Sequence, residues 1–129
     1  MNISLKPIVT TLLTTLIVGL SAFAQPFGLV LHGGAGTITK DGLSKERQAE
    51  YEAVIKEALD TGYALLNNGH SADDAVVETI KILEDSPLFN AGRGSVLNVN
   101  GQVEMDASIM LGKDLNAGAV AGVESQTPN

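Results

Sequence analysis

The sequence predicts an α+β fold in which a pair of helices packs on an incomplete, mainly antiparallel sheet. Three observations indicate this class. A short apolar run comes first, two stretches with helical periodicity follow it, and alternating apolar residues then fill the last third of the chain. Helices followed by consecutive strands are typical of folds in which the helices cover one face of an antiparallel sheet.

The first 24 residues have the composition of a signal peptide. Lys6 supplies a positive charge, residues 7–20 are apolar or small, and Ala22 and Ala24 form the small-residue pattern that signal peptidase accepts. The apolar run is shorter than the roughly 20 residues that span a bilayer. We therefore expect cleavage before Gln25, export to a periplasm or outside the cell, and no stable membrane anchor.

Composition excludes several classes of protein. The chain has 129 residues, no cysteine and a formal net charge of −7. It therefore has no disulfide scaffold, thiolate nucleophile or cysteine-based metal site, and its acidity argues against a nucleic-acid surface. The two histidines, His32 and His70, are too far apart in sequence for a metalloprotease helix motif. Residues 25–129 are enough for one domain at most.

The first element after the leader is the apolar run 27–31, which predicts a buried strand. His32-Gly33-Gly34-Ala35-Gly36 follows it directly. Such a glycine-rich segment is either a tight turn or a cradle of backbone N–H groups for an anion or a reacting oxygen. The glycines alone favour the plain turn.

Two helices are predicted next. Apolar residues at helical spacing cover Ser44–Asn68, with Ser44 as the N-cap and Gly69 in the left-handed conformation at the end. Ser71 caps a second helix that ends near Glu84, ahead of a proline. The short connection predicts an antiparallel helix pair. We interpret His70, between the helices, as a solvated loop residue.

Strands are predicted for the rest of the chain. Residues 96–99 form one strand, and Asn100-Gly101 favours a type I′ hairpin turn. Residues 103–110 alternate between apolar and polar, and 117–123 form a strand of small residues. Asp106 lies within the alternating strand, and we interpret it as a structural carboxylate rather than a catalytic one.

Three of these segments carry a resemblance to a known family. HGGAG (32–36), PLFNAGRGSV (87–96) and VEMDASIM (103–110) are similar to the plant-type L-asparaginase / isoaspartyl peptidase (β-aspartyl peptidase) family, and AGAVAGV (117–123) extends the match. The resemblance implies an N-terminal-nucleophile hydrolase with an αββα sandwich fold. The helix pair and strands of this chain would be part of that sandwich.

The resemblance also implies an activity. Precursors of this family cut themselves into an α and a β subunit, and the new N-terminal threonine of the β subunit attacks L-asparagine or β-aspartyl (isoaspartyl) dipeptides. The Gly-Thr-Val-Gly type motif that holds this threonine does not occur here. We therefore expect residues 25–129 to be the α-subunit part of such a domain, truncated before the nucleophile and inactive alone. Its partners would be the β subunit of the same precursor and a second αβ unit.

Site residues are implied by the same resemblance. Gly33 and Gly34 would lie at the active-site edge and support self-cleavage through their backbone, and Asn90 would either order the site or simply form a turn. No cofactor is required, but a structural Na⁺ is expected in the loop after the second helix. Either main-chain carbonyls hold this ion or the loop is a plain hydrated helix end. The carbonyls belong to Leu83, Glu84, Ser86, Phe89, Ala91 and Arg93.

One departure and two alternative functions remain open. Leu111 stands where family members often have an aspartate, which could alter the turn or a contact across the subunit boundary. A glycosylasparaginase of the same superfamily is one alternative. The other is a non-catalytic module that binds a small ligand at the glycine turn.

Overall fold

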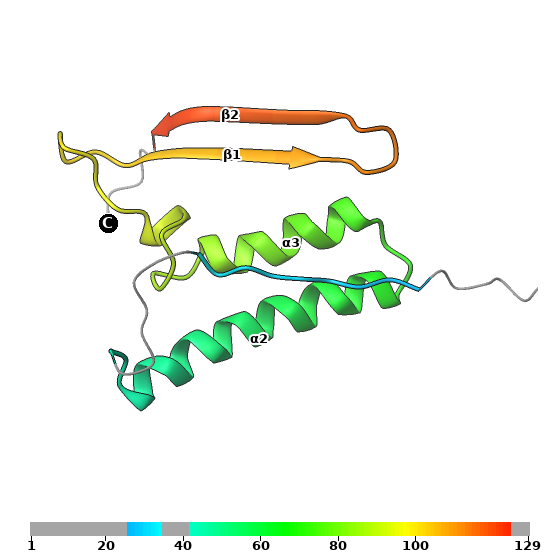
Figure 1. Ribbon diagram of the computed structural model, residues 1–129, viewed down its shortest axis with the longest axis horizontal. Helices are drawn as coiled ribbons and strands as arrows, with labels where there is room; N and C mark the ends of the chain where they lie inside the picture. Colours follow the sequence, from blue (N-terminus) through cyan, green and yellow to red (C-terminus); the bar gives the residue numbers. More distant parts are fainter. Residues whose placement is uncertain (1–25, 35–41, 125–129) are drawn as a thin grey trace, which may run out of the picture.

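The structure is a computed structural model that describes residues 26–34 and 42–124 (Figure 1). The predicted leader (1–24), Ala35 and Gly36 lie outside the described residues. In chain order the regular elements are the helices α2 (Lys45–Asn67) and α3 (Ala72–Glu84), the 3₁₀ turn η1 (Gly92–Gly94), and the strands β1 (Glu104–Met110) and β2 (Ala117–Glu124).

Both helices begin at the serine caps that the sequence predicts. The Ser44 hydroxyl accepts a hydrogen bond from the backbone N–H of Arg47 at 3.2 Å. Ser71 does the same for Asp74, and its hydroxyl also donates to the Asp74 carboxylate at 2.7 Å. These bonds satisfy N–H groups that have no partner inside the helix. Gly69 has a φ of 81°, as expected for a glycine after a helix end.

The helices pack side by side in Figure 1, and the buried residues lie between them and the loop that follows α3. Phe89 from that loop is 6% exposed and joins the two helices at the centre of the core. The core consists of Ala58, Leu83 and Phe89, with Leu31, Tyr51, Val54, Ile55, Ile82 and Leu88 packed around it.

The segment 26–34 is extended but is not the buried strand that we expected. It lies along the helix pair in Figure 1, with Leu29 and Leu31 half-buried against it and Val30 96% exposed. No strand pairs with it among the described residues. A short apolar run predicts the extended conformation, whereas a strand also needs a hydrogen-bonding neighbour that a local pattern does not reveal.

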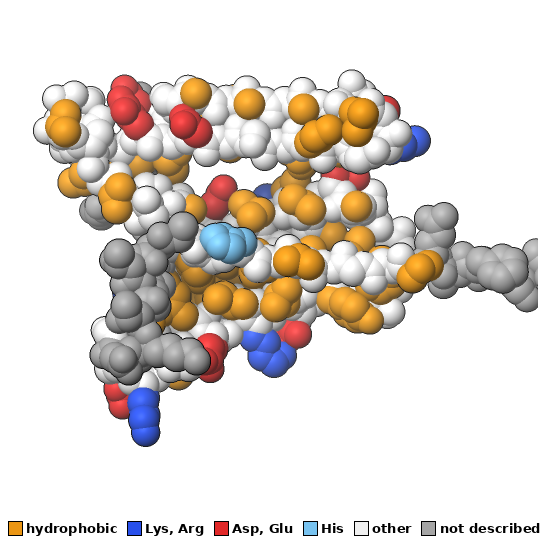
Figure 2. Space-filling model, viewed as in Figure 1, with side chains coloured by type: hydrophobic (Ala, Val, Ile, Leu, Met, Phe, Trp, Pro, Cys, Tyr) orange, Lys and Arg blue, Asp and Glu red, His pale blue; other side chains and the backbone are white. Residues whose placement is uncertain are grey.

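Strands β1 and β2 form a two-stranded antiparallel sheet, with Met110 opposite Ala117 and Glu104 opposite Glu124. The register shifts between Met105 and Ala107, which marks a β-bulge. Together with the helix pair, this open sheet confirms the predicted α+β class and its incomplete, antiparallel sheet. Figure 2 shows hydrophobic side chains on the outer surface of both the sheet and the helix pair.

The predicted strand 96–99 is reduced to a single bridge between Leu97 and Val103. The turn there is not type I′. That type needs positive φ at two adjacent residues, and Gly101 (φ 77°) has it whereas Asn100 does not. The side-chain oxygen of Asn98 accepts hydrogen bonds from the backbone N–H groups of Asn100 and Gln102. These bonds close a loop that is longer than a two-residue turn.

A second turn connects β1 to β2. The Leu111 N–H donates to the Asn116 carbonyl at 2.8 Å, and the Leu111 carbonyl accepts from the N–H of Leu115 at 2.9 Å. The Leu111 backbone therefore closes the turn whichever side chain it carries. Leu115 has a φ of 61°, which is the one positive φ among the non-glycine residues described. None of the described helices is long and apolar enough to cross a membrane.

Candidate functional site

A cavity of about 610 Å³ lies where the extended segment meets α2, the end of α3 and the following loop. It collects residues that are far apart in the sequence. Among the predicted site residues, Gly33, Gly34 and Asn90 line it together with four positions of the proposed ion loop. Those four are Leu83, Glu84, Phe89 and Ala91, whereas Ser86 and Arg93 are not among the lining residues.

The glycine turn enters this cavity from the end of the extended segment. Gly34 has a φ of 111°, a conformation open to glycine but strained for other residues. Its N–H donates to Nδ1 of His32 at 3.2 Å. Gly33 lies so close to Phe89 that an added Cβ would be 3.2 Å from the ring. A side chain at Gly33 would have to displace the Phe89 ring slightly, and one at Gly34 would strain the backbone.

The loop after α3 forms the opposite wall. The side-chain oxygen of Asn90 accepts the N–H of Val96 at 2.9 Å, so Asn90 holds the two ends of the loop together. The Ser86 hydroxyl, in a residue only 8% exposed, accepts the N–H of Leu88 at 3.3 Å. The geometry thus gives Asn90 a definite turn-closing role, whatever else it does at the cavity.

Two loop glycines leave room for main-chain carbonyls. A Cβ on Gly92 would lie 2.3 Å from the carbonyl oxygen of Glu84, and one on Gly94 would lie 2.1 Å from that of Phe89. Both carbonyls belong to the predicted sodium ligands. Carbonyl oxygens are the kind of ligand that a hard cation takes. Two of the six predicted ones, those of Leu83 and Ala91, already accept N–H groups from Ser86 and Gly94. No group of three or more His, Asp or Glu side chains that could hold a metal occurs in the described parts of the chain.

Charged groups with altered pKa values lie away from the cavity lining. The pKa of Glu46 is lowered by a hydrogen bond from its own backbone and by the Ser44 hydroxyl, at the exposed start of α2. The pKa of Lys81 is raised by its hydrogen bond and ion pair with Glu78 on exposed α3. Both shifts belong to helix surfaces, whereas the titratable side chains that line the cavity are those of His32, Tyr51 and Glu84.

Asp106 borders a second cavity of about 410 Å³, which shares Glu84, Asn90 and Ala91 with the first. Its carboxylate accepts the N–H of Gly122 at 2.9 Å across the bulge. His70 is exposed in the turn between the helices, as interpreted from the sequence. Thr79 is buried and donates to the Ala75 carbonyl, so it is committed to the helix.

Four residues that line the cavity are not among the site residues named from the sequence, and they are His32, Tyr51, Ile80 and Leu88. Tyr51, Ile80 and Leu88 line the cavity but read locally as ordinary apolar positions. Tyr51 belongs to the apolar stripe of α2, which predicts burial and nothing more. Tyr51 differs from the other apolar residues of α2 because its ring contacts Phe89 in the loop after α3.

Comparisons with known proteins agree with the resemblance. A family model described as Asparaginase matches residues 24–127. The isoaspartyl peptidase/L-asparaginase of Danio rerio is 55% identical over 95 residues, covering 74% of this chain and 29% of that protein. A plant-type L-asparaginase of Pyrococcus furiosus is 56% identical over 95 residues, with the same two shares, 74% and 29%.

The human isoaspartyl peptidase/L-asparaginase is 54% identical over 100 residues, which cover 78% of this chain and 31% of the human protein. The chain thus spans less than a third of the length of each of these relatives. The similarity reaches across the glycine turn, the helix pair and the hairpin.

Proposed function

This chain belongs to the asparaginase family, whose model matches residues 24–127, and we propose that it is the N-terminal (α-subunit) part of a self-cleaving threonine hydrolase. The whole enzyme hydrolyses L-asparagine, β-aspartyl dipeptides, or both. Relatives named plant-type L-asparaginase and isoaspartyl peptidase/L-asparaginase support this substrate class. The observation that carries the proposal is the cavity that joins Gly33, Gly34 and Asn90.

The cavity wall can stabilise a reacting carbonyl but lacks a nucleophile. Its lining holds no threonine, serine or lysine among the described residues. Thr61 and Thr79 lie inside helices, and Thr79 donates to a main-chain carbonyl. The threonine nucleophile is therefore supplied by the β subunit, and this chain contributes backbone groups at the active-site edge. Residues 25–129 alone are inactive.

The glycine turn suits the self-cleavage step. A developing oxyanion is stabilised by backbone N–H groups that approach it without an intervening side chain. Gly33 has a ring packed on one side, and Gly34 has a conformation unsuited to a side chain. Gly33 and Gly34 therefore bring backbone to the cavity, where the precursor's scissile bond would lie. The Gly34 N–H is held by Nδ1 of His32 and would have to leave it to stabilise an oxyanion.

A structural Na⁺ in the loop after α3 is part of the proposal. Main-chain carbonyls of the six loop positions would hold it, beginning with Glu84 and Phe89, whose oxygens lie against loop glycines. The ion supplies no chemistry to the hydrolysis, and its effect is to fix the loop that closes the cavity. Asn90 acts beside it by tying the loop to Val96.

Export and assembly complete the proposal. The family match begins at residue 24, next to the cleavage site predicted before Gln25, which supports the assignment of residues 1–24 as a leader. The mature protein would act in a periplasm or outside the cell. Two αβ units would associate, because strand β2 and the outer sheet face are exposed here and suit further protein packing.

The test uses the product of the complete reading frame that contains these residues. We expect it to release aspartate from L-asparagine or β-aspartyl-leucine after self-cleavage, while residues 25–129 expressed alone release none. Hydrolysis of glycosylasparagine in preference to both would assign the glycosylasparaginase alternative. A complete product that binds small ligands without hydrolysing any of them would contradict an enzymatic function.

A further inference from the structure

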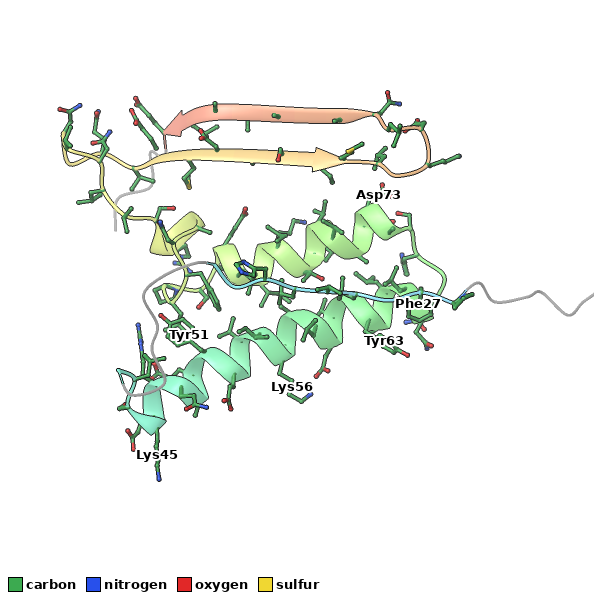
Figure 3. All side chains as sticks on the ribbon, viewed as in Figure 1. Phe27, Lys45, Tyr51, Lys56, Tyr63 and Asp73 are labelled. Atoms are coloured by element: carbon green, nitrogen blue, oxygen red, sulfur yellow. The ribbon has the colours of Figure 1, made fainter. Side chains whose placement is uncertain are left out.

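Two aromatic pairs hold the extended segment 26–34 along α2. Near the start of the segment, the rings of Phe27 and Tyr63 lie 5.1 Å apart at 53° (Figure 3). Near its end, Gly33 lies against Phe89, and the Phe89 ring meets that of Tyr51 edge-on, with centroids 5.5 Å apart at 89°. Only the second pair borders the candidate site.

The Tyr51 ring makes two contacts, one with the guanidinium of Arg47 and one with the ring of Phe89. The guanidinium carbon of Arg47, one turn earlier on α2, lies 5.4 Å from the centre of the Tyr51 ring. Such a cation–π contact and an edge-to-face pair both depend on the orientation of the ring, unlike simple apolar burial. Tyr51 is thereby held on the rigid helix and in turn restricts the Phe89 ring.

Phe89 passes this restriction to the glycine turn. A Cβ on Gly33 would lie 3.2 Å from Cε1 of Phe89 and 3.7 Å from Cδ1 of Ile55, so the backbone of Gly33 rests directly on the ring. Phe89 itself is 6% exposed and belongs to the core, and it also lines the cavity. The position of the Phe89 ring therefore sets how far the Gly33 backbone can reach into the cavity.

We propose that Tyr51 is a positioning residue for the glycine turn, acting through the Phe89 ring on Gly33. The inference rests on the proposed function in one respect, which is that the turn borders the site of self-cleavage. Tyr51 reaches the turn through its contact with Phe89, the residue against which Gly33 packs. Its effect is to keep Gly33 and Gly34 at one distance from the reacting group, where small displacements are costly.

The test compares variants of the complete reading-frame product. Tyr51→Leu keeps apolar bulk but removes the edge-on ring, and Tyr51→Phe retains the ring. Tyr63→Leu is the matched control, because it removes the equivalent ring from the other end of the same helix. Each variant is assayed for self-cleavage rate, for thermal midpoint, and for hydrogen–deuterium exchange in peptides that cover residues 26–34.

We expect Tyr51→Leu to slow self-cleavage by about tenfold or more and to speed exchange around Gly33. Tyr51→Phe should keep the wild-type rates of self-cleavage and of exchange around Gly33. Tyr63→Leu should lower the thermal midpoint without slowing self-cleavage. We expect Phe89→Leu to give the same changes as Tyr51→Leu. Phe89→Leu is the variant to use if Tyr51→Leu does not fold. Equal slowing by Tyr51→Leu and Tyr63→Leu, or no slowing by either, would overturn the proposal.

The exchange measurement separates this proposal from the proposed function. If the wild-type product never cleaves itself, the proposed function fails, and positioning is then judged by exchange alone. Faster exchange around Gly33 in Tyr51→Leu, with wild-type exchange in Tyr51→Phe, still supports the role of Tyr51. Unchanged exchange in Tyr51→Leu and Phe89→Leu overturns it.

Discussion

The carboxylate of Asp106 on β1 accepts a hydrogen bond from the backbone N–H of Gly122 on β2, with an N···O distance of 2.9 Å. The contact spans the β-bulge, where the pairing shifts between Met105 and Ala107. Gly122 has a φ of 64°, so its N–H turns away from the regular ladder. The Asp106 side chain takes the place of the missing backbone acceptor.

Replacing Asp106 should weaken the hairpin but leave the chemistry intact. Asp106→Ala removes the acceptor for the Gly122 N–H and is expected to cost about 1 kcal/mol in the free energy of unfolding. Asp106→Asn keeps a side-chain oxygen and should retain hydrolytic activity within a few-fold of wild type. Denaturant unfolding and activity of the complete product measure the two effects.

The neighbouring Glu104 provides the control for Asp106. It lies on the same exposed strand, and Glu104→Ala is expected to change stability by less than about 0.5 kcal/mol. A loss of activity of about a hundredfold or more in Asp106→Asn, without loss of stability, would instead identify a catalytic carboxylate.

The turn between β1 and β2 stores strain at Leu115. Its φ of 61° brings Cβ close to the backbone, and its side chain is 70% exposed, so little burial offsets that strain. Leu115→Asn should stabilise the protein by about 0.5–1 kcal/mol, because asparagine tolerates this conformation. Thermal unfolding measures the gain. Leu111→Asn, at ordinary φ in the same turn, should give none, and equal gains for both variants would argue against strain relief.

Gly92 is required by the loop that closes the cavity. An alanine there would place Cβ 2.3 Å from the Glu84 carbonyl oxygen, at a φ of 52°. Gly92→Ala should cost roughly 2–3 kcal/mol, because a backbone atom cannot move aside as a flexible side chain can. Gly112→Ala is the control, since nothing lies within 4 Å of its added Cβ. Similar stability losses for both variants would contradict this close approach.

Sodium should stabilise the complete product through the loop after α3. A ligand that binds only the folded state raises its stability by mass action. We expect a higher thermal midpoint in sodium chloride than in choline chloride at equal ionic strength, and Gly92→Ala should lose the difference. Identical midpoints of the wild-type product in both salts would show that carbonyls of this loop hold no sodium.

Local patterns in the sequence predicted the helices well and the sheet only partly. Ser44 and Ser71 act within one turn of their own helix, so a short window contains the whole interaction. The bulge opposite Asp106 adds a residue to β2 that alternation alone does not show. Segment 27–31 pairs with no strand in the described part of the chain. Strand formation there depends on a neighbouring strand, which a local apolar run cannot specify.

The features of the candidate site also divide into those that the sequence predicted and those that it did not. Gly33, Gly34 and Asn90 could be named from motifs, because the resemblance includes them, and the structure brings them to one cavity. The contact between Tyr51 and Phe89 could not be predicted, since it joins α2 to the loop that follows α3 in the sequence. Such contacts follow from packing, which no periodicity encodes.

The central claim is that this chain is the N-terminal part of a self-cleaving threonine hydrolase. Intact-mass analysis and N-terminal sequencing of the purified product of the complete reading frame test it directly. We predict two chains, one containing residues 25–129 and the other beginning with threonine, with hydrolysis of L-asparagine or a β-aspartyl dipeptide. A single uncut chain, whether active or inactive, would contradict the claim.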